Sequence, residues 1–131
     1  MPQFVHMDIS ADDPERAARF YERVFGWTIT RLEGPTPYWL LTPPEGGTAP
    51  GAGIAARSAP WQGVTPTIDV ASADLYADRI VKEGGTIFIP KTEIPGVGQL
   101  VTFKDTEGNV LAILEPATDS QFAAPAASPG A

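Results

Sequence analysis

The sequence contains no cysteine among its 131 residues. Disulfides, thiol catalysis and thiolate metal sites are therefore excluded. Positive charge is also scarce, since 9 Lys and Arg stand against 16 Asp and Glu and the formal net charge is −7. Nucleic-acid surfaces and polybasic membrane contacts need clustered Lys and Arg, so we expect neither partner. No apolar run approaches the ~20 residues of a membrane span, and no signal peptide is recognisable. These absences predict a soluble, cytoplasmic protein.

Turn-forming residues are abundant instead, with 14 Pro and 13 Gly. The length suits a single domain that is large enough to bury a core. We predict that this domain covers residues 1–117. The segment 118–131 is rich in Ala, Pro and Ser, a composition typical of a flexible tail.

The first half of the chain alternates between two hydrophobic periods. Residues 4–9 have the two-residue period of a strand buried on one side. Asp12-Asp13-Pro14 then supplies a helix cap and a first-turn proline, and apolar residues at helical spacing follow until Gly26. Three further strands are predicted at residues 27–32, 38–42 and 52–56, separated by Gly- and Pro-rich turns.

The second half repeats this order. A strand is predicted at 65–70, a helix at 73–82 and strands at 86–89, 99–103 and 110–114. The strand positions His6 and Thr65 are 59 residues apart (65 − 6), and so are the helix-ending Gly26 and Gly85 (85 − 26). Self-similarity at a constant offset indicates a duplicated unit. We therefore predict two β-α-β-β-β modules, at residues 4–57 and 63–116.

Two motifs resemble a known superfamily. The first is HMDISADDPERAARFY, from His6 to Tyr21, with VFGW after it; the second is DTEGNVL, from Asp105 to Leu111. Both are similar to motifs of the vicinal-oxygen-chelate superfamily of glyoxalases, bleomycin-resistance proteins and extradiol dioxygenases, over residues 4–116. The nearest group is the glyoxalase-like proteins related to lactoylglutathione lyase. The resemblance implies an α+β fold in which the two modules form a curved, cleft-containing mixed sheet with helices on the convex side. It also implies a homodimer.

The resemblance further implies four positions for metal ligands, and this chain fills one of them with a ligand. His6 occupies the first position, whereas Thr65, Ala112 and a position near Gly53 carry no metal ligand of the expected type. Transition-metal sites use about three or four protein donors. We therefore expect no metal cofactor. The alternative is a divalent ion held by His6, to which Asp8 contributes a second ligand.

Strand alternation places the candidate binding residues on the concave face of that sheet. Trp39, Trp61 and Phe103 are candidate aromatic walls of the cleft, and the alternative for them is core packing or a dimer contact; Trp27 is assigned to the core. The other residues predicted to lie on this face and to contact a ligand are His6, Asp8, Thr65, Thr67, Asp69, Ala112 and Leu114.

Three functions remain open. The first is a bleomycin-resistance-type protein that binds a small molecule without a metal. The second is a glyoxalase-like lyase or isomerase, or a dioxygenase, in which His6 is a metal ligand or a general base oriented by Asp8. The third is a structural or interaction module with a vestigial cleft. Serine-hydrolase and phosphate-loop motifs are absent from the sequence.

Overall fold

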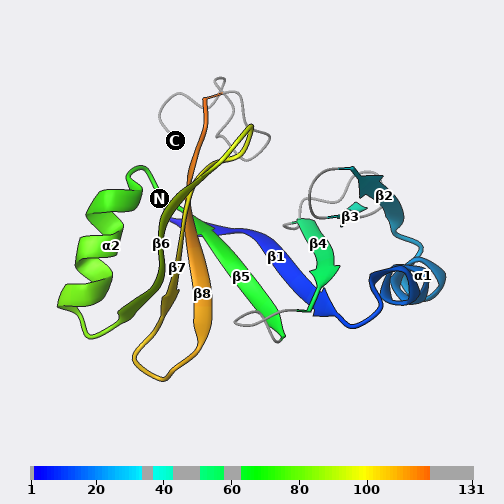
Figure 1. Cartoon of the computed structure of the whole chain (residues 1–131), viewed down its shortest axis with the longest axis horizontal. Helices are drawn as coiled ribbons and strands as arrows, with labels where there is room; N and C mark the ends of the chain where they lie inside the picture. Colours follow the sequence, from blue (N-terminus) through cyan, green and yellow to red (C-terminus); the bar gives the residue numbers. More distant parts are fainter. Residues whose placement is uncertain (1, 34–36, 43–50, 58–62, 119–131) are drawn as a thin grey trace. The chain divides into compact units, whose positions relative to one another are not determined.

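The computed structural model describes residues 2–33, 37–42, 51–57 and 63–118 (Figure 1). The predicted tail, apart from its first residue, and Trp61 lie outside these ranges. Two compact units are present: an N-terminal unit of residues 4–67, and a C-terminal unit of residues 68–131 joined by residues 1–3. The boundary falls inside β5 (Val64–Asp69).

The helix of the N-terminal unit, α1 (Pro14–Phe25), begins and ends where the sequence predicts. The side chain of Asp13 caps it by accepting a hydrogen bond from the backbone N–H of Arg16 (3.1 Å). Pro14 occupies the first turn, where a backbone N–H has no intrahelical partner to lose. Gly26 ends the helix in the left-handed conformation (φ 72°), and its N–H donates to the carbonyl of Glu22.

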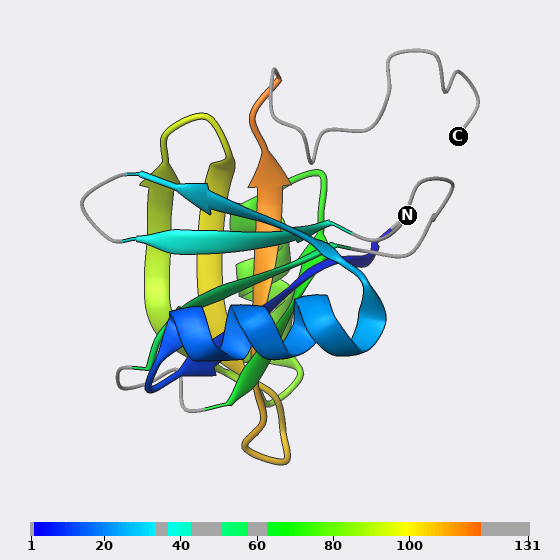
Figure 2. The same cartoon turned by 90° about the vertical axis from the view of Figure 1, so that its right-hand side faces the viewer.

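Four strands form the sheet of this unit, in the order β2 (Thr28–Leu32), β3 (Tyr38–Thr42), β4 (Gly51–Ala56) and β1 (Gln3–Ala11). The pairs β2–β3 and β3–β4 are antiparallel, whereas β1 and β4 are parallel. Chain neighbours are therefore not always sheet neighbours, because β4 lies between β3 and β1. Figure 2 shows α1 along its length, with β2 and β3 following it in lighter blue and cyan.

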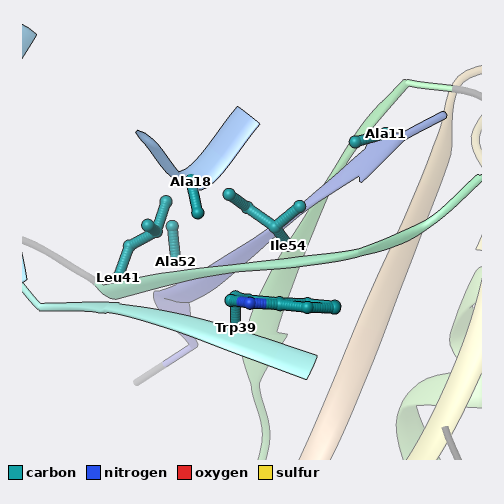
Figure 3. Close-up of a cluster of buried hydrophobic side chains, with 6 residues drawn as sticks. All are labelled: Ala11, Ala18, Trp39, Leu41, Ala52 and Ile54. Carbon is teal, nitrogen blue, oxygen red and sulfur yellow. The ribbon is translucent and has the colours of Figure 1, made fainter. Parts of the chain in front are cut away.

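One face of this sheet packs against α1 and forms the core of the unit. In Figure 3, Ala18 of the helix points toward Leu41 and Ala52 of the strands. Ile54 is completely buried at the centre of the cluster. Trp27 packs against its edge, which confirms its assignment to the core. The buried members of the cluster are Ala11, Ala18, Trp39, Leu41, Ala52 and Ile54.

The strand register shows which residues lie on the face of the N-terminal sheet that is opposite to the core. Asp8 and Leu40 both lie opposite Gly53, on either side of β4. Since successive side chains alternate between the two faces, Tyr38 shares a face with Leu40, and His6 shares a face with Asp8. The face turned away from α1 therefore carries His6, Asp8, Tyr38 and the two glycines of β4.

The C-terminal unit repeats the plan with α2 (Ala73–Lys82) and an antiparallel sheet in the order β8 (Val110–Pro116), β7 (Gly98–Lys104) and β6 (Thr86–Ile94). Ser72 caps α2 by accepting from the backbone N–H of Leu75. The element order of the chain confirms the two predicted β-α-β-β-β modules. The buried members of the second core cluster are Val70, Ala73, Val101, Phe103 and Ile113.

The strand expected at residues 86–89 is longer than predicted. It continues through Pro90 to Ile94, with register irregularities between Ile87 and Ile89 and between Ile89 and Thr92. Proline cannot donate to a ladder, but it is tolerated beside bulges and on a strand at the end of a sheet, which is the position of β6. The strand therefore runs through Pro90 and ends five residues beyond its predicted end at Ile89.

The turn before β8 is held by one carboxylate. Oδ1 of Asp105 accepts hydrogen bonds from the backbone N–H groups of Glu107 (2.8 Å) and Asn109 (2.9 Å), and Oδ2 accepts from the Asn109 side chain. Its bonds with Asn109, and more weakly those from Glu107 and Gly108, lower the pKa of Asp105 below its ordinary value. This network explains the motif at residues 105–109 as turn chemistry. Within the described ranges, no helix is long and apolar enough to cross a membrane.

Candidate functional site

Three polar side chains meet on the face of the N-terminal sheet that α1 does not cover. His6 and Asp8 come from β1, as their alternation predicts, and Tyr38 reaches them from β3. The Tyr38 hydroxyl donates to Oδ1 of Asp8 (2.6 Å) and lies 2.5 Å from Nε2 of His6. Nε2 of His6 is also 3.3 Å from Oδ1 of Asp8. The three groups therefore form one closed hydrogen-bonded cluster, which we call the His6–Tyr38–Asp8 cluster.

The position of the protons in this cluster follows from donor counting. A phenol has one proton, and Tyr38 gives it to the Asp8 carboxylate. The short contact between the phenol oxygen and Nε2 of His6 then requires a proton on Nε2. Tyr38 therefore selects the His6 ring state that carries a proton on Nε2.

The phenol of Tyr38 stays protonated in this environment. Burial raises the pKa of Tyr38 well above its usual value, and the charge of Asp8 and the hydrogen bond to it raise the pKa further. Each of these causes disfavours a phenolate beside a carboxylate. Tyr38 is therefore a fixed hydrogen-bond donor to Asp8 and not a general base.

Gly53 provides the space that Tyr38 occupies. A Cβ atom placed on Gly53 would overlap the hydroxyl and two ring carbons of Tyr38, so the ring passes directly over the glycine. Gly51 lies two residues earlier on the same face of β4, and a Cβ there would meet only the carbonyl of Leu41 at 3.9 Å. A side chain at position 53 is thus incompatible with the observed position of Tyr38.

The cluster combines a buried imidazole, that of His6, with an accessible carboxylate, that of Asp8. The side chain of His6 is 9 % exposed, whereas that of Asp8 is 41 % exposed. The buried imidazole is held in place by its neighbours, and a ligand that approaches this face meets the Asp8 carboxylate. The two predicted residues His6 and Asp8 are brought together in this way.

The other predicted binding residues lie in different parts of the fold. Thr65 and Thr67 of β5 are both buried within the N-terminal unit. Ala112 and Leu114 of β8 are buried in the C-terminal unit and alternate with Ile113, which belongs to the core cluster under α2. Ala112 and Leu114 therefore lie on the sheet face that is turned away from α2.

Two predicted aromatic walls are not at a ligand face. Trp39 alternates with Tyr38 and packs into the core cluster of the N-terminal unit, next to Ile54. Phe103 packs into the core cluster under α2. The prediction that Trp39 and Phe103 line a ligand cleft was therefore wrong. Both side chains pack in a core, because the position of a residue along its strand determines which face of the sheet it occupies. Tyr38 is the aromatic residue that sequence reasoning did not assign to the site. Its signal is the Gly51-Ala52-Gly53 pattern, which leaves one face of a strand without side chains.

A groove of about 410 Å³ lies elsewhere in the N-terminal unit, between the end of β1 and the first turns of α1. Its charged groups are paired with one another, because Arg57 binds Asp12 (3.1 Å) and Arg16 lies near Asp13. None of the residues of the His6–Tyr38–Asp8 cluster lines this groove. We therefore place the candidate site at the cluster and not at the groove.

The residues present do not fit the family-type metal site that the sequence motifs imply. The Tyr38 hydroxyl lies next to Nε2 of His6, where it binds both His6 and Asp8, and Gly53 has no side chain to offer as a ligand. The resemblance assigns two further ligand positions to Thr65 and Ala112, and neither has a side chain of the expected type. No group of three or more His, Cys, Asp or Glu that could hold a metal ion occurs in the described part of the chain.

Comparison with known proteins shows one consistent family. The family model described as "Glyoxalase/Bleomycin resistance protein/Dioxygenase superfamily" matches residues 3–113. A protein of Didymella fabae described as "Glyoxylase-like domain-containing protein" is 31 % identical over 118 residues, which cover 85 % of this chain and 91 % of that protein. CFP32 of Mycobacterium tuberculosis, described as a candidate glyoxylase, is 28 % identical over 84 % of this chain. The match spans 42 % of the length of CFP32.

Solved structures are similar in fold at low sequence identity. Methylmalonyl-CoA epimerase from Mycobacterium tuberculosis has a TM-score of 0.68 at 16 % identity and covers 87 % of each chain. A hypothetical protein, BH1468 from Bacillus halodurans, has a TM-score of 0.72 at 12 % identity, over 92 % of this chain and 98 % of its own. At such identities the likeness shows a shared fold, and the reaction has to be argued from the site.

Proposed function

Because the chain belongs to the Glyoxalase/Bleomycin resistance protein/Dioxygenase superfamily, we propose that it binds a small molecule on the sheet face that carries His6 and Asp8, without a metal ion. The observation that supports this proposal is the Tyr38 hydroxyl, which satisfies His6 and Asp8 with hydrogen bonds. Binding sites of this kind use a few fixed polar groups to orient a ligand. A homodimer and a cytoplasmic location belong to the same proposal.

The cluster is suited to binding because it is organised before a ligand arrives. His6 is buried and hydrogen-bonded, and in the described residues no buried side-chain nitrogen or oxygen lacks a partner. A ligand therefore does not have to order these side chains, and the entropy lost on binding is smaller. Because the Tyr38 hydroxyl is already the hydrogen-bond partner of Nε2, the buried imidazole of His6 does not need a metal ion as its partner.

The first test is metal analysis combined with ligand binding. We expect the purified protein to contain far less than one equivalent of Zn²⁺, Ni²⁺, Mn²⁺ or Fe²⁺ per chain. Thermal shifts against a panel of metabolites and antibiotics should be the same with EDTA and with added divalent ions. A ligand at ~100 times its Kd raises the free energy of unfolding by about 2.7 kcal/mol, which such a screen detects. One tightly bound ion per chain, or binding that EDTA abolishes, would contradict the proposal.

A glyoxalase-type lyase or isomerase is the second candidate, and the shared protons of the cluster favour it. Hydrogen bonds join the His6 imidazole through Tyr38 to the Asp8 carboxylate, and an imidazole oriented in this way is a group suited to exchange a proton with a bound substrate. In this function His6 is the catalytic residue and Tyr38 orients it. The role needs no metal step, and it uses the same sheet face as the binding proposal.

His6→Ala tests this second function. General acid–base catalysis contributes roughly 10²- to 10⁴-fold, so we expect the variant to lose at least ~100-fold in turnover of any substrate found in a screen. Arg23→Ala, on the exposed side of α1, is the control and should retain full turnover. Circular dichroism should show that both variants are folded. Turnover that survives in His6→Ala would exclude His6 as the acid or base.

A further inference from the structure

Asp8 is the charged side chain that this face of the N-terminal sheet offers to a ligand. Among the described strand residues on the Tyr38 side of β1 to β4, the others are Phe, Thr, Ser, Gly, Ala and Leu, together with His6. Arg31 lies opposite Trp39 in the register and therefore belongs to the α1 side. Within the described strands β1 to β4, this face carries one carboxylate and no Arg or Lys.

The cation that directly follows β4 is already engaged. Arg57 follows β4, and its guanidinium binds Asp12 (3.1 Å), the Ser10 hydroxyl (3.4 Å) and the Ser10 carbonyl (3.3 Å). These contacts hold its guanidinium at Ser10 and Asp12, toward the C-terminal end of β1. Asp8 therefore accepts one hydrogen bond from Tyr38 and lies 3.3 Å from Nε2 of His6, and within the described ranges it forms no ion pair with Arg or Lys.

The two oxygens of Asp8 have different surroundings. Oδ1 accepts from Tyr38 and faces His6. Oδ2 has no hydrogen-bond partner among the described residues, and the side chain is 41 % exposed. An ionised carboxylate oxygen is an acceptor only. Oδ2 is therefore an oriented acceptor that a donor from solution can reach, and Tyr38 is the residue that positions it.

We infer that the site recognises ligands that carry a cationic hydrogen-bond donor, such as a primary amine or an amidine, through Oδ2 of Asp8, and that it discriminates against anionic ligands. The inference rests on the proposed binding function and names the ligand class for it. Hydrogen bonds with a charged partner are the stronger ones, and an ammonium next to a lone carboxylate gains Coulomb energy as well. A phosphate or carboxylate at the same place meets like charge.

The donors of the cluster are also unavailable to an anion. The Tyr38 proton is directed to Asp8, and the Nε2 proton of His6 is directed to the phenol oxygen. We expect this chain not to bind an anionic ligand at the cluster, because the Asp8 carboxylate there has the same sign of charge.

The experiment is a fragment screen with three matched charge classes. The full chain, labelled with ¹⁵N, is titrated with primary amines, alcohols and carboxylates built on the same set of aromatic frames. We expect amines to perturb the amide signals of Asp8 and Gly53 at about tenfold lower concentration than the matched alcohols, and carboxylates to be weakest. Equal or tighter binding of carboxylates at these signals overturns the inference and leaves the binding function standing. If no class binds there, the binding function fails as well.

Asp8→Asn tests the role of the charge directly. It removes the charge and keeps an oxygen that accepts from Tyr38. We expect affinity for the amines to fall about tenfold while affinity for the alcohols stays within twofold. Asp78→Asn removes the same charge from the exposed surface of α2 and should change neither affinity. If the two variants weaken amine binding equally, the effect is one of net charge and Asp8 is not the recognition group. Unfolding in urea confirms that both variants are folded.

Discussion

Replacing Gly53 with alanine is expected to lower the free energy of unfolding by about 3 kcal/mol and to abolish ligand binding at the cluster. The added Cβ would overlap the hydroxyl and two ring carbons of Tyr38. Either the ring leaves its place or the strands move apart, and overpacking of this kind costs roughly 1–3 kcal/mol. Displacement of the ring also breaks the bonds of Tyr38 with His6 and Asp8, which adds the cost of unsatisfied buried groups.

Gly51 offers a matched control on the same strand and face. A Cβ there meets one carbonyl oxygen at an ordinary contact distance of 3.9 Å. Gly51→Ala should therefore change the free energy of unfolding by less than about 0.5 kcal/mol or stabilise slightly, because alanine restricts the unfolded chain. Urea unfolding followed by tryptophan fluorescence measures both variants.

A double variant shows whether Tyr38 is the cause. In a Tyr38→Ala background the space over Gly53 is open, so Gly53→Ala should cost far less than it does in the wild-type chain. A coupling of about 2 kcal/mol between the two positions is expected. If Gly53→Ala proves as harmless as Gly51→Ala, or if its cost is independent of residue 38, then Tyr38 does not pass over Gly53.

Tyr38→Phe is expected to lower the free energy of unfolding by about 2 kcal/mol at pH 7. The ring and its packing over Gly53 remain, but the proton donor to Asp8 and the acceptor for His6 are lost. His6 is buried, so its Nε2–H group loses its phenol partner in a place that water reaches poorly. We also expect weaker binding of amines, because Oδ1 of Asp8 is no longer held.

The pH dependence of this variant provides a second readout. The folded-state pKa of Tyr38 is raised above its unfolded value, so the unfolded chain releases this proton near pH 10 while the folded chain keeps it. The stabilisation is thus complete below about pH 10 and is lost as the pH rises beyond it. Wild-type stability should fall more steeply above pH 10 than that of Tyr38→Phe.

An alkaline absorbance titration separates this effect from simple loss of packing. The difference between the wild-type and Tyr38→Phe titrations should contain no phenolate signal near pH 10 in the folded state, and should show one when both chains are unfolded in urea. If a Tyr38 phenolate formed near pH 10 in the folded chain, burial and the Asp8 carboxylate would not be raising the pKa of the phenol.

Local sequence signals predicted most of the fold. The caps at Asp13 and Ser72 set the starts of both helices, and these signals act within one turn of chain. The two-residue period of β1 placed His6 and Asp8 on one face, because alternation is a property of an extended backbone itself. The strand predicted to end at Ile89 shows the limit of such signals. It continues through Pro90, because tolerance of proline depends on where a strand lies in its sheet.

The sequence alone thus determined the two β-α-β-β-β modules, the shared face of His6 and Asp8 and the deficit of metal ligands. Only the tertiary structure decided that Tyr38 completes the cluster, because β4 brings β3 and β1 together although Tyr38 is 30 residues from Asp8. It likewise assigned Trp39 and Phe103 to the cores, since each helix covers one particular face of its sheet. Strand parity is local, whereas strand order depends on contacts between distant segments. The partner of a buried histidine follows from strand order.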